Sequence, residues 1–150
     1  MSNTEHERKL ALPPIHFVDG ALAPVGCPGA RRLALYFSAA WCGPCRAFTP
    51  KLRQFYQATS REDVEIVFVS LDHNANTFAE YYADMPWLAV DFDKTDREGL
   101  YDILRIKGIP ALVVFCPRTG RIVSTDGRQD VLRHMDDPQA CVDRWCQEQG

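Results

Sequence analysis

The residues with the clearest potential for chemistry are two cysteines three positions apart, Cys42 and Cys45. Two thiols at this spacing can alternate between a dithiol and an internal disulfide, and a thiolate of such a pair attacks disulfides in other molecules. The same spacing also occurs in zinc sites, which need a second pair of ligands. No second pair with this spacing exists among the other cysteines, so the pattern favours redox chemistry over a metal site. These other cysteines are Cys27, Cys116, Cys141 and Cys146.

The position of the pair in the chain supports this interpretation. Cys42 directly follows an apolar run over residues 33–37 and precedes a stretch with helical periodicity. It is therefore expected at a helix N-terminus, where free N–H groups and the helix dipole stabilise an anion. A thiol there can have its pKa lowered from about 8.5 to about 3.5–7.5. Cys45 lies one turn further on, and Pro44 is tolerated in a first turn because its missing N–H would be unpaired anyway.

A second segment of interest is Gly108-Ile109-Pro110-Ala111, which leads into another apolar run. A proline is allowed at the first residue of a strand because it need not donate a hydrogen bond to the sheet. The residues alone leave the Ile109–Pro110 bond open between trans and cis, since only about 5–6% of such bonds are cis.

The elements that must position these residues are indicated by hydrophobic patterning. Three runs, at residues 33–37, 64–69 and 111–115, are apolar on both faces, as in strands buried on both sides of a sheet. A fourth run over residues 121–124 follows a turn sequence at 117–120, which predicts a hairpin.

Helical spacing of apolar residues appears between and after these strands, in segments 48–59, 78–82, 100–104 and 142–146. The predicted order is strand, helix, strand, helix, helix, strand, strand, helix. Such alternation predicts an α/β fold with a central mixed β-sheet flanked by helices.

Length and composition are those of an ordinary globular domain: 150 residues, 46% hydrophobic, 25% charged. The formal net charge of −3 excludes the basic footprint expected of a nucleic-acid-binding protein. The start of the chain contains no long apolar run, which argues against a secretory signal or a membrane span. We therefore expect a cytoplasmic protein with mostly reduced thiols.

Residues 1–30 are rich in Pro and Gly and are predicted to form an N-terminal extension, with one hairpin near residues 16–18. A domain over residues 31–150 is predicted to follow it.

The chain resembles the thioredoxin superfamily, and within it the tryparedoxin and nucleoredoxin branch. The superfamily is indicated by Trp41-Cys42-Gly43-Pro44-Cys45, by Pro50 and by Ile109-Pro110. The branch is indicated by residues 35–39, 48–50, 67–70 and 85–90, and by Gly127-Arg128 with Val131-Leu132.

This resemblance implies a thioredoxin-like fold and assigns roles to individual residues. Cys42 would be the exposed attacking cysteine and Cys45 the resolving one, with Gly43 and Pro44 supporting the site. Pro110 would be cis, opposite the cysteines, and the backbone of Ile109 would pair with the substrate chain, as in strand addition. Trp41 would form an apolar platform over the site.

Some positions depart from the family pattern. Thioredoxins carry a buried acid at the position of Tyr36, and a tyrosine with a pKa near 10 is a poor base at neutral pH. The tryparedoxin branch also has tyrosine there, which supports that branch.

Tryparedoxins have an acid that holds the polyamine of trypanothione, and its position is occupied by His73. Arg128 matches a family position on the trypanothione-facing side, and a solvated loop arginine is the alternative. Asp72 or His73, at a strand end, could relay protons to Cys45, while Arg105 and Lys107 could keep Cys42 ionised.

The predicted function is reduction of protein disulfides by dithiol exchange through Cys42 and Cys45, without a cofactor. The resemblance implies peroxiredoxin-like clients. It leaves three kinds of electron donor open: a low-molecular-weight dithiol such as trypanothione, the monothiol glutathione, or a reductase protein. No nucleic-acid or membrane partner is expected, and we expect a monomer. The alternative is a nucleoredoxin-like binding module in which the pair senses oxidation and regulates a partner protein.

Overall fold

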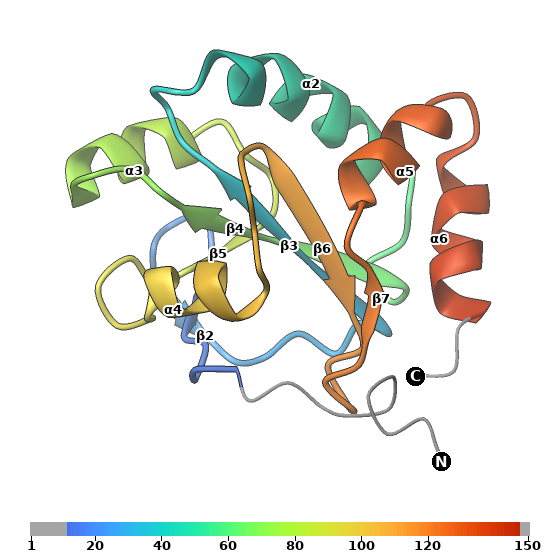
Figure 1. The fold of residues 1–150 in the computed structure, drawn as a ribbon, viewed down its shortest axis with the longest axis horizontal. Helices are drawn as coiled ribbons and strands as arrows, with labels where there is room; N and C mark the ends of the chain where they lie inside the picture. The colour runs from blue at the N-terminus through green and yellow to red at the C-terminus, as the bar shows by residue number, and fades with distance from the viewer. Residues whose placement is uncertain (1–11, 148–150) are drawn as a thin grey trace.

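The computed structural model describes residues 12–147 and shows a seven-stranded sheet with helices packed against both faces (Figure 1). The strands are β1 (Phe17–Val18), β2 (Pro24–Val25), β3 (Arg32–Ser38), β4 (Val64–Ser70), β5 (Leu88–Val90), β6 (Ala111–Phe115) and β7 (Ile122–Ser124). The helices are α2 (Gly43–Gln57), α3 (Ala75–Tyr82), α4 (Arg97–Ile103), α5 (Gly127–Arg133) and α6 (Pro138–Gln147).

The strand order is β2-β1-β5-β4-β3-β6-β7, so β3 lies between β4 and β6. Strand β3 runs parallel to β4 and antiparallel to β6, and β4 runs parallel to β5. The predicted mixed sheet is therefore confirmed. All residues of β3 and β4 are buried, as expected for strands that are apolar on both faces.

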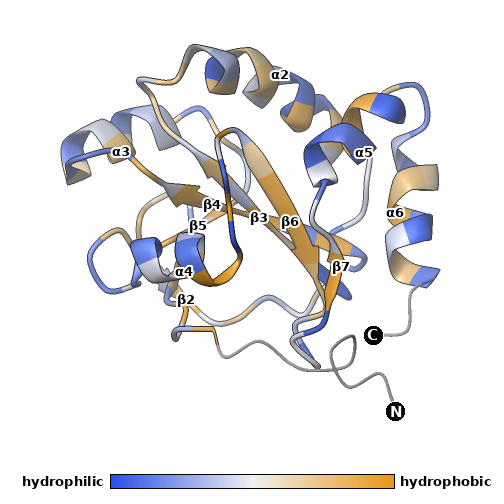
Figure 2. Cartoon of the chain, in the orientation of Figure 1, coloured by the Kyte–Doolittle hydropathy of each residue, from blue (hydrophilic) through white to orange (hydrophobic). Residues whose placement is uncertain are grey.

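Alternate residues of β3 serve two hydrophobic cores, because successive side chains of a strand point to opposite faces. Ala34 and Tyr36 belong to the core formed with α2, α3, α5 and α6. Leu33, Leu35 and Phe37 belong to the core formed with α4 and with residues of the N-terminal segment. The central strands are accordingly the most hydrophobic part of the ribbon, while each helix carries both hydrophobic and hydrophilic residues (Figure 2).

Two elements, β5 and α5, were not predicted from hydrophobic patterning. Strand β5 has three residues, too few for a periodicity, and it follows Trp87, whose side chain is 1% exposed. Helix α5 has seven residues and begins at Gly127. A Cβ at this glycine would stand 2.7 Å from the backbone oxygen of Leu112, so only glycine lets α5 lie this close to β6.

The N-terminal segment contributes the hairpin that was predicted near residues 16–18. Strands β1 and β2 pair antiparallel, and the Asp19 carboxylate accepts hydrogen bonds from the backbone N–H groups of Ala21 and Ala23 in the turn. Strand β1 also pairs with β5, so these residues extend the sheet. Part of the predicted extension, residues 1–11, lies outside the described residues, and the domain boundary at residue 30 stays a prediction. Within residues 12–147, none of the helices has the length and hydrophobicity that crossing a bilayer requires.

The Cys42–Cys45 site

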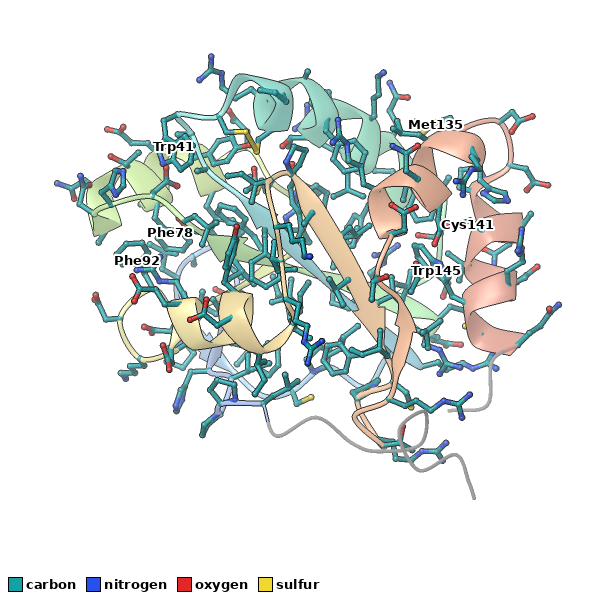
Figure 3. The ribbon with its side chains drawn as sticks, in the orientation of Figure 1. Trp41, Phe78, Phe92, Met135, Cys141 and Trp145 are labelled. Carbon is teal, nitrogen blue, oxygen red and sulfur yellow. A yellow bond between two sulfur atoms is a disulfide. The ribbon has the colours of Figure 1, made fainter. Side chains whose placement is uncertain are left out.

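The two cysteines lie where β3 ends and α2 begins, as predicted. Cys42 is the N-cap of α2, and its Sγ accepts a hydrogen bond from the backbone N–H of Cys45 at 3.3 Å. The two residues form a disulfide, with their Cα atoms 5.2 Å apart. Pro44 stands in the first turn of the helix, where no hydrogen bond is lost. The disulfide lies at the end of the molecule where α2 begins, beside the loop that carries Trp41 (Figure 3).

The expectation that Cys42 is exposed is wrong for this disulfide form. Cys42 is 7% exposed and Cys45 is fully buried. Cys42 and Cys45 belong to a small apolar cluster that also contains Ala39, Leu71 and Ile109. Cys42 is nevertheless the more exposed of the two residues, which makes it the better candidate for contact with a second molecule.

The Ile109–Pro110 peptide bond is cis, as the family resemblance implied. Sγ of Cys42 lies 3.8 Å from the carbonyl oxygen of Ile109, so the segment before β6 faces the disulfide directly. Pro110 is buried and Ile109 is half-buried. The predicted pairing of the Ile109 backbone with a substrate chain is compatible with this placement and stays a prediction.

Trp41 and His73 form a flat aromatic surface beside the cysteines. Their rings are stacked, with centroids 6.1 Å apart and planes inclined by 10°. Trp41 is 55% exposed, which is unusual for a tryptophan and leaves most of its indole available to another molecule. The structure therefore brings together two residues that the sequence proposed separately for substrate contact.

Asp72, which was considered for a proton relay, fixes the position of a loop, and the relay itself stays a prediction. Its side chain is 3% exposed. One carboxylate oxygen accepts a hydrogen bond from the backbone N–H of Ala40 at 2.8 Å, and the other accepts one from the Ser70 hydroxyl at 2.8 Å. Asp72 thereby anchors the loop between β3 and the cysteines to the end of β4. The pattern Ser70-x-Asp72 at a strand end was the available signal for this contact, which sequence reasoning missed.

A network of hydroxyl groups lies buried behind Cys45. The Tyr36 hydroxyl is 2.6 Å from Oγ1 of Thr49, which donates to the carbonyl oxygen of Cys45 at 3.0 Å. The Tyr81 hydroxyl bridges Oγ1 of Thr49 at 3.0 Å and the Ser38 hydroxyl at 2.8 Å. Burial raises the pKa of Tyr36 well above its usual value, so the phenol stays neutral at physiological pH. The network holds the first turn of α2 in place and supplies no base.

Arg128 lies on the Pro110 side of the site, at the start of α5. Its guanidinium carbon is 5.8 Å from the ring centroid of Phe48, and its Nε atom is buried without a hydrogen-bond partner among the described residues. Arg128 lines a cavity of about 360 Å³ together with Arg105, Lys107 and Pro110. The structure therefore gathers three cationic side chains next to the cis-proline. Contact of Arg128 with substrate stays a prediction, and so does the effect of Arg105 and Lys107 on the ionisation of Cys42.

An acidic cavity adjoins His73 on the other side of the cysteines. Its volume is about 790 Å³, and it extends from the end of β4 to the first turns of α4. Its acidic lining residues are Asp72, Asp93, Asp96, Glu98 and Asp102. Hydrophobic patterning had not indicated this cavity, because its carboxylates come from the loop before α4 and from the exposed face of that short helix.

Comparison with known proteins places the chain in a family. Residues 29–122 match the family model described as "Thioredoxin-like". The chain is 40% identical to tryparedoxin from Trypanosoma brucei brucei over 104 residues, covering 68% of this chain and 72% of that protein. It is also 40% identical over 118 residues to probable nucleoredoxin 1 from Arabidopsis thaliana, covering 77% of this chain but only 20% of that protein.

Solved structures agree with the sequence matches. The structure of tryparedoxin II complexed with glutathionylspermidine superposes with a TM-score of 0.76 at 37% identity, covering 85% of this chain and 89% of that one. The chain belongs to the thioredoxin-like family, and its relatives are tryparedoxins and nucleoredoxins. It spans a fifth of the length of the plant nucleoredoxin.

Proposed function

We propose that the protein is a thiol–disulfide oxidoreductase that reduces disulfides in other proteins. The observation that carries this proposal is the Cys42–Cys45 disulfide at the N-terminus of α2, with the Ile109 carbonyl group 3.8 Å from Sγ of Cys42. Two cysteines at a helix N-terminus, of which Cys42 is slightly exposed and Cys45 fully buried, suit a two-step exchange, because the helix N-terminus stabilises the attacking thiolate.

In the first step, the Cys42 thiolate attacks one sulfur of a client disulfide. A bond forms between Cys42 and that sulfur, the client disulfide bond breaks, and the other client sulfur leaves as a thiolate. In the second step, the Cys45 thiolate attacks Sγ of Cys42. The internal disulfide forms, the mixed disulfide breaks, and the second client thiolate departs. Two electrons have passed from the dithiol to the client.

The surroundings of the pair position the client. An extended client segment beside Ile109 would exchange backbone hydrogen bonds with it, a contact with little sequence preference. The exposed Trp41 indole, stacked on His73, offers apolar contact area on the other side of the cysteines.

Cys45 must lose its proton before the second step, and Tyr36 cannot accept it, because burial keeps that phenol neutral.

We further propose that a low-molecular-weight dithiol with a cationic arm returns the disulfide to the dithiol form. The related tryparedoxin II has been solved with glutathionylspermidine. In this chain the cavity beside His73 presents the carboxylates of Glu98 and Asp102, which would attract a polyamine. We also propose that the clients are peroxiredoxin-like and that the protein acts in the cytoplasm.

The donor is tested by measuring reduction of the oxidised protein by trypanothione and by glutathione. The double variant Glu98→Gln, Asp102→Asn should raise KM for trypanothione while leaving the rate with glutathione unchanged. Equal effects on both donors would show that the cavity does not recognise a cationic arm.

The oxidoreductase activity is tested by insulin-disulfide reduction with the wild type and with Cys42→Ser. The variant should lose the activity, and an equal rate in both proteins would contradict the proposal.

The alternative of a redox-sensing binding module is distinguished with Cys45→Ser, which leaves the mixed disulfide unresolved. Several disulfide-linked clients favour the oxidoreductase, whereas one partner held without a covalent bond favours the module.

A further inference from the structure

The cavity beside Pro110 carries more positive charge than its own lining neutralises. It has a volume of about 360 Å³ and lies between the α4–β6 loop and the start of α5. Three cations line it, Arg105, Lys107 and Arg128, against one carboxylate, that of Asp126. Within residues 12–147, none of these three cations takes part in an ion pair. This cavity, the Pro110 cavity, therefore keeps a net positive charge that is available to an anion.

Arg105 occupies a backbone position that favours glycine. It follows the C-cap of α4, and its φ of 56° lies in the left-handed region. Its backbone N–H donates to the carbonyl oxygen of Asp102, and that of Ile106 donates to the carbonyl oxygen of Tyr101, both at 3.1 Å. This is a Schellman motif, in which glycine usually takes the position of Arg105 because a Cβ is strained there. An arginine at this position points to a role of its side chain outside the helix end.

The charges of Arg105 and Lys107 are free for a second molecule. Both residues are exposed, and among the described residues neither side chain has a hydrogen bond or a ring contact. Asp102, the nearest carboxylate to Arg105 along the chain, lines the acidic cavity beside His73. Arg128 adds a third charge, with its Nε buried and without a hydrogen-bond partner in the described part of the chain. Arg128 was considered above for substrate contact, whereas Arg105 and Lys107 have not been given a role in recognition.

The Pro110 cavity lies beside the backbone that the proposed function assigns to client binding. Ile109, whose carbonyl oxygen is 3.8 Å from Sγ of Cys42, directly precedes Pro110. A Cβ placed on Gly108 would meet no atom within 4 Å, so the backbone before Ile109 is open to another chain. In Figure 1 the α4–β6 loop reaches the upper end of β6, on the side of the molecule where α2 begins. An extended client segment beside Ile109 would present every second side chain to the same side, and hence to the cavity.

We propose that the Pro110 cavity, through Arg105 and Lys107, selects protein clients that carry a glutamate or an aspartate close to the disulfide cysteine. This inference rests on the proposed function of Cys42 and specifies which clients the site prefers. The acidic cavity beside His73 repels the same carboxylate. The two cavities together therefore favour one direction of the client's charges across the disulfide.

The test uses the reduced full-length protein and three peptides, each with one cysteine in a disulfide with 2-thiopyridine. This leaving group is uncharged, and its release is followed by absorbance. One peptide has glutamine two residues before and two residues after the cysteine, and the other two have glutamate at one of these places. The rate of Cys42→Ser is subtracted, because the remaining thiols also react. The better glutamate peptide should react about fivefold faster than the glutamine peptide, and this preference should shrink at high salt.

A matched pair of double variants ties this preference to the two exposed cations. Arg105→Gln with Lys107→Gln should lower the ratio of the glutamate rate to the glutamine rate below about twofold, whereas Arg105→Lys with Lys107→Arg should keep it. Both rates are measured in the same protein, so a general change in the reactivity of Cys42 cancels in the ratio.

Arg105→Gly separates recognition from folding. Glycine suits the left-handed position, so this variant should unfold at a urea concentration at least as high as the wild type, while its ratio of rates falls. A destabilised Arg105→Gly with an unchanged ratio would show that the arginine serves the fold, which would contradict the proposal.

Equal rates for all three peptides, or a preference that survives Arg105→Gln with Lys107→Gln, would overturn the proposal and leave the proposed function intact. A protein that reacts with none of the peptides through Cys42 would contradict the proposed function, and this proposal with it. The same double variant is also oxidised and reduced with glutathione. A higher KM for glutathione with an unchanged peptide ratio would assign the cavity to carboxylates of the electron donor, against the proposal.

Discussion

Replacing Tyr36 with phenylalanine separates the structural role of the buried hydroxyl network from a catalytic one. The phenylalanine ring fills the same space, and the change removes only the hydroxyl that contacts Thr49 and, at 3.4 Å, the carbonyl oxygen of Cys45. Each such hydrogen bond contributes about 1 kcal/mol net. Thr49 keeps its bonds to Cys45 and Tyr81, so no buried group loses its last partner. We therefore expect a loss of about 1–2 kcal/mol in unfolding free energy.

The assay combines urea unfolding with the pH dependence of insulin reduction. Because the pKa of Tyr36 is raised by burial, the phenol is already neutral across the working range, and its removal should leave the pH–rate profile unchanged. General-base catalysis contributes typically 10²–10⁴-fold to a rate. A fall of that size in Tyr36→Phe, or a displaced pH profile with a normal fold, would show that Tyr36 carries a proton in the reaction.

Three further changes test other parts of the structure. Trp41→Ala should change stability by less than about 0.5 kcal/mol, because the side chain is largely exposed, yet raise KM for a protein client by roughly fivefold or more. Gly127→Ala should cost about 1–3 kcal/mol in urea unfolding, since the new Cβ would meet the Leu112 backbone oxygen; an unchanged midpoint would refute this packing argument. Burial raises the pKa of Glu65 above 4.5 in the folded state, although Tyr56 donates hydrogen bonds to the carboxylate. The contribution of Glu65 to the stability of the fold is therefore present at low pH and is lost as the pH rises through the raised pKa. Glu65→Gln should therefore be at least as stable as the wild type at pH 7, with the difference vanishing below about pH 4.5, as urea unfolding at several pH values would show.

The long elements could be predicted from the sequence because burial leaves a strong pattern. Strands β3, β4 and β6 are buried on both faces, and α2 repeats its apolar residues over four turns. Strand β5 is too short for a periodicity, and helix α5 buries only Gly127 and Val131 and depends on tertiary contacts, such as the approach of Gly127 to Leu112. Propensity is a weak prior wherever such contacts decide.

The site could be predicted as far as its chemistry is local. The spacing of Cys42 and Cys45 and their place at a helix N-terminus follow from neighbouring residues. The contacts that surround them join distant segments: Asp72 with Ala40, His73 with Trp41, and Tyr81 with Ser38 and Thr49. Such contacts depend on how β4 and α3 pack beside β3, which no local pattern specifies. The burial of Cys42 likewise depends on the disulfide and on Ile109, 67 residues away in the chain.

The central claim is that Cys42 attacks and Cys45 resolves. It is tested most directly by mixing reduced Cys45→Ser and reduced Cys42→Ser, separately, with a disulfide-containing protein client and separating the products without reductant. The account predicts a covalent complex through Cys42 in Cys45→Ser, which dithiothreitol releases, and none in Cys42→Ser. A complex that forms only in Cys42→Ser, linked through Cys45, would contradict the account.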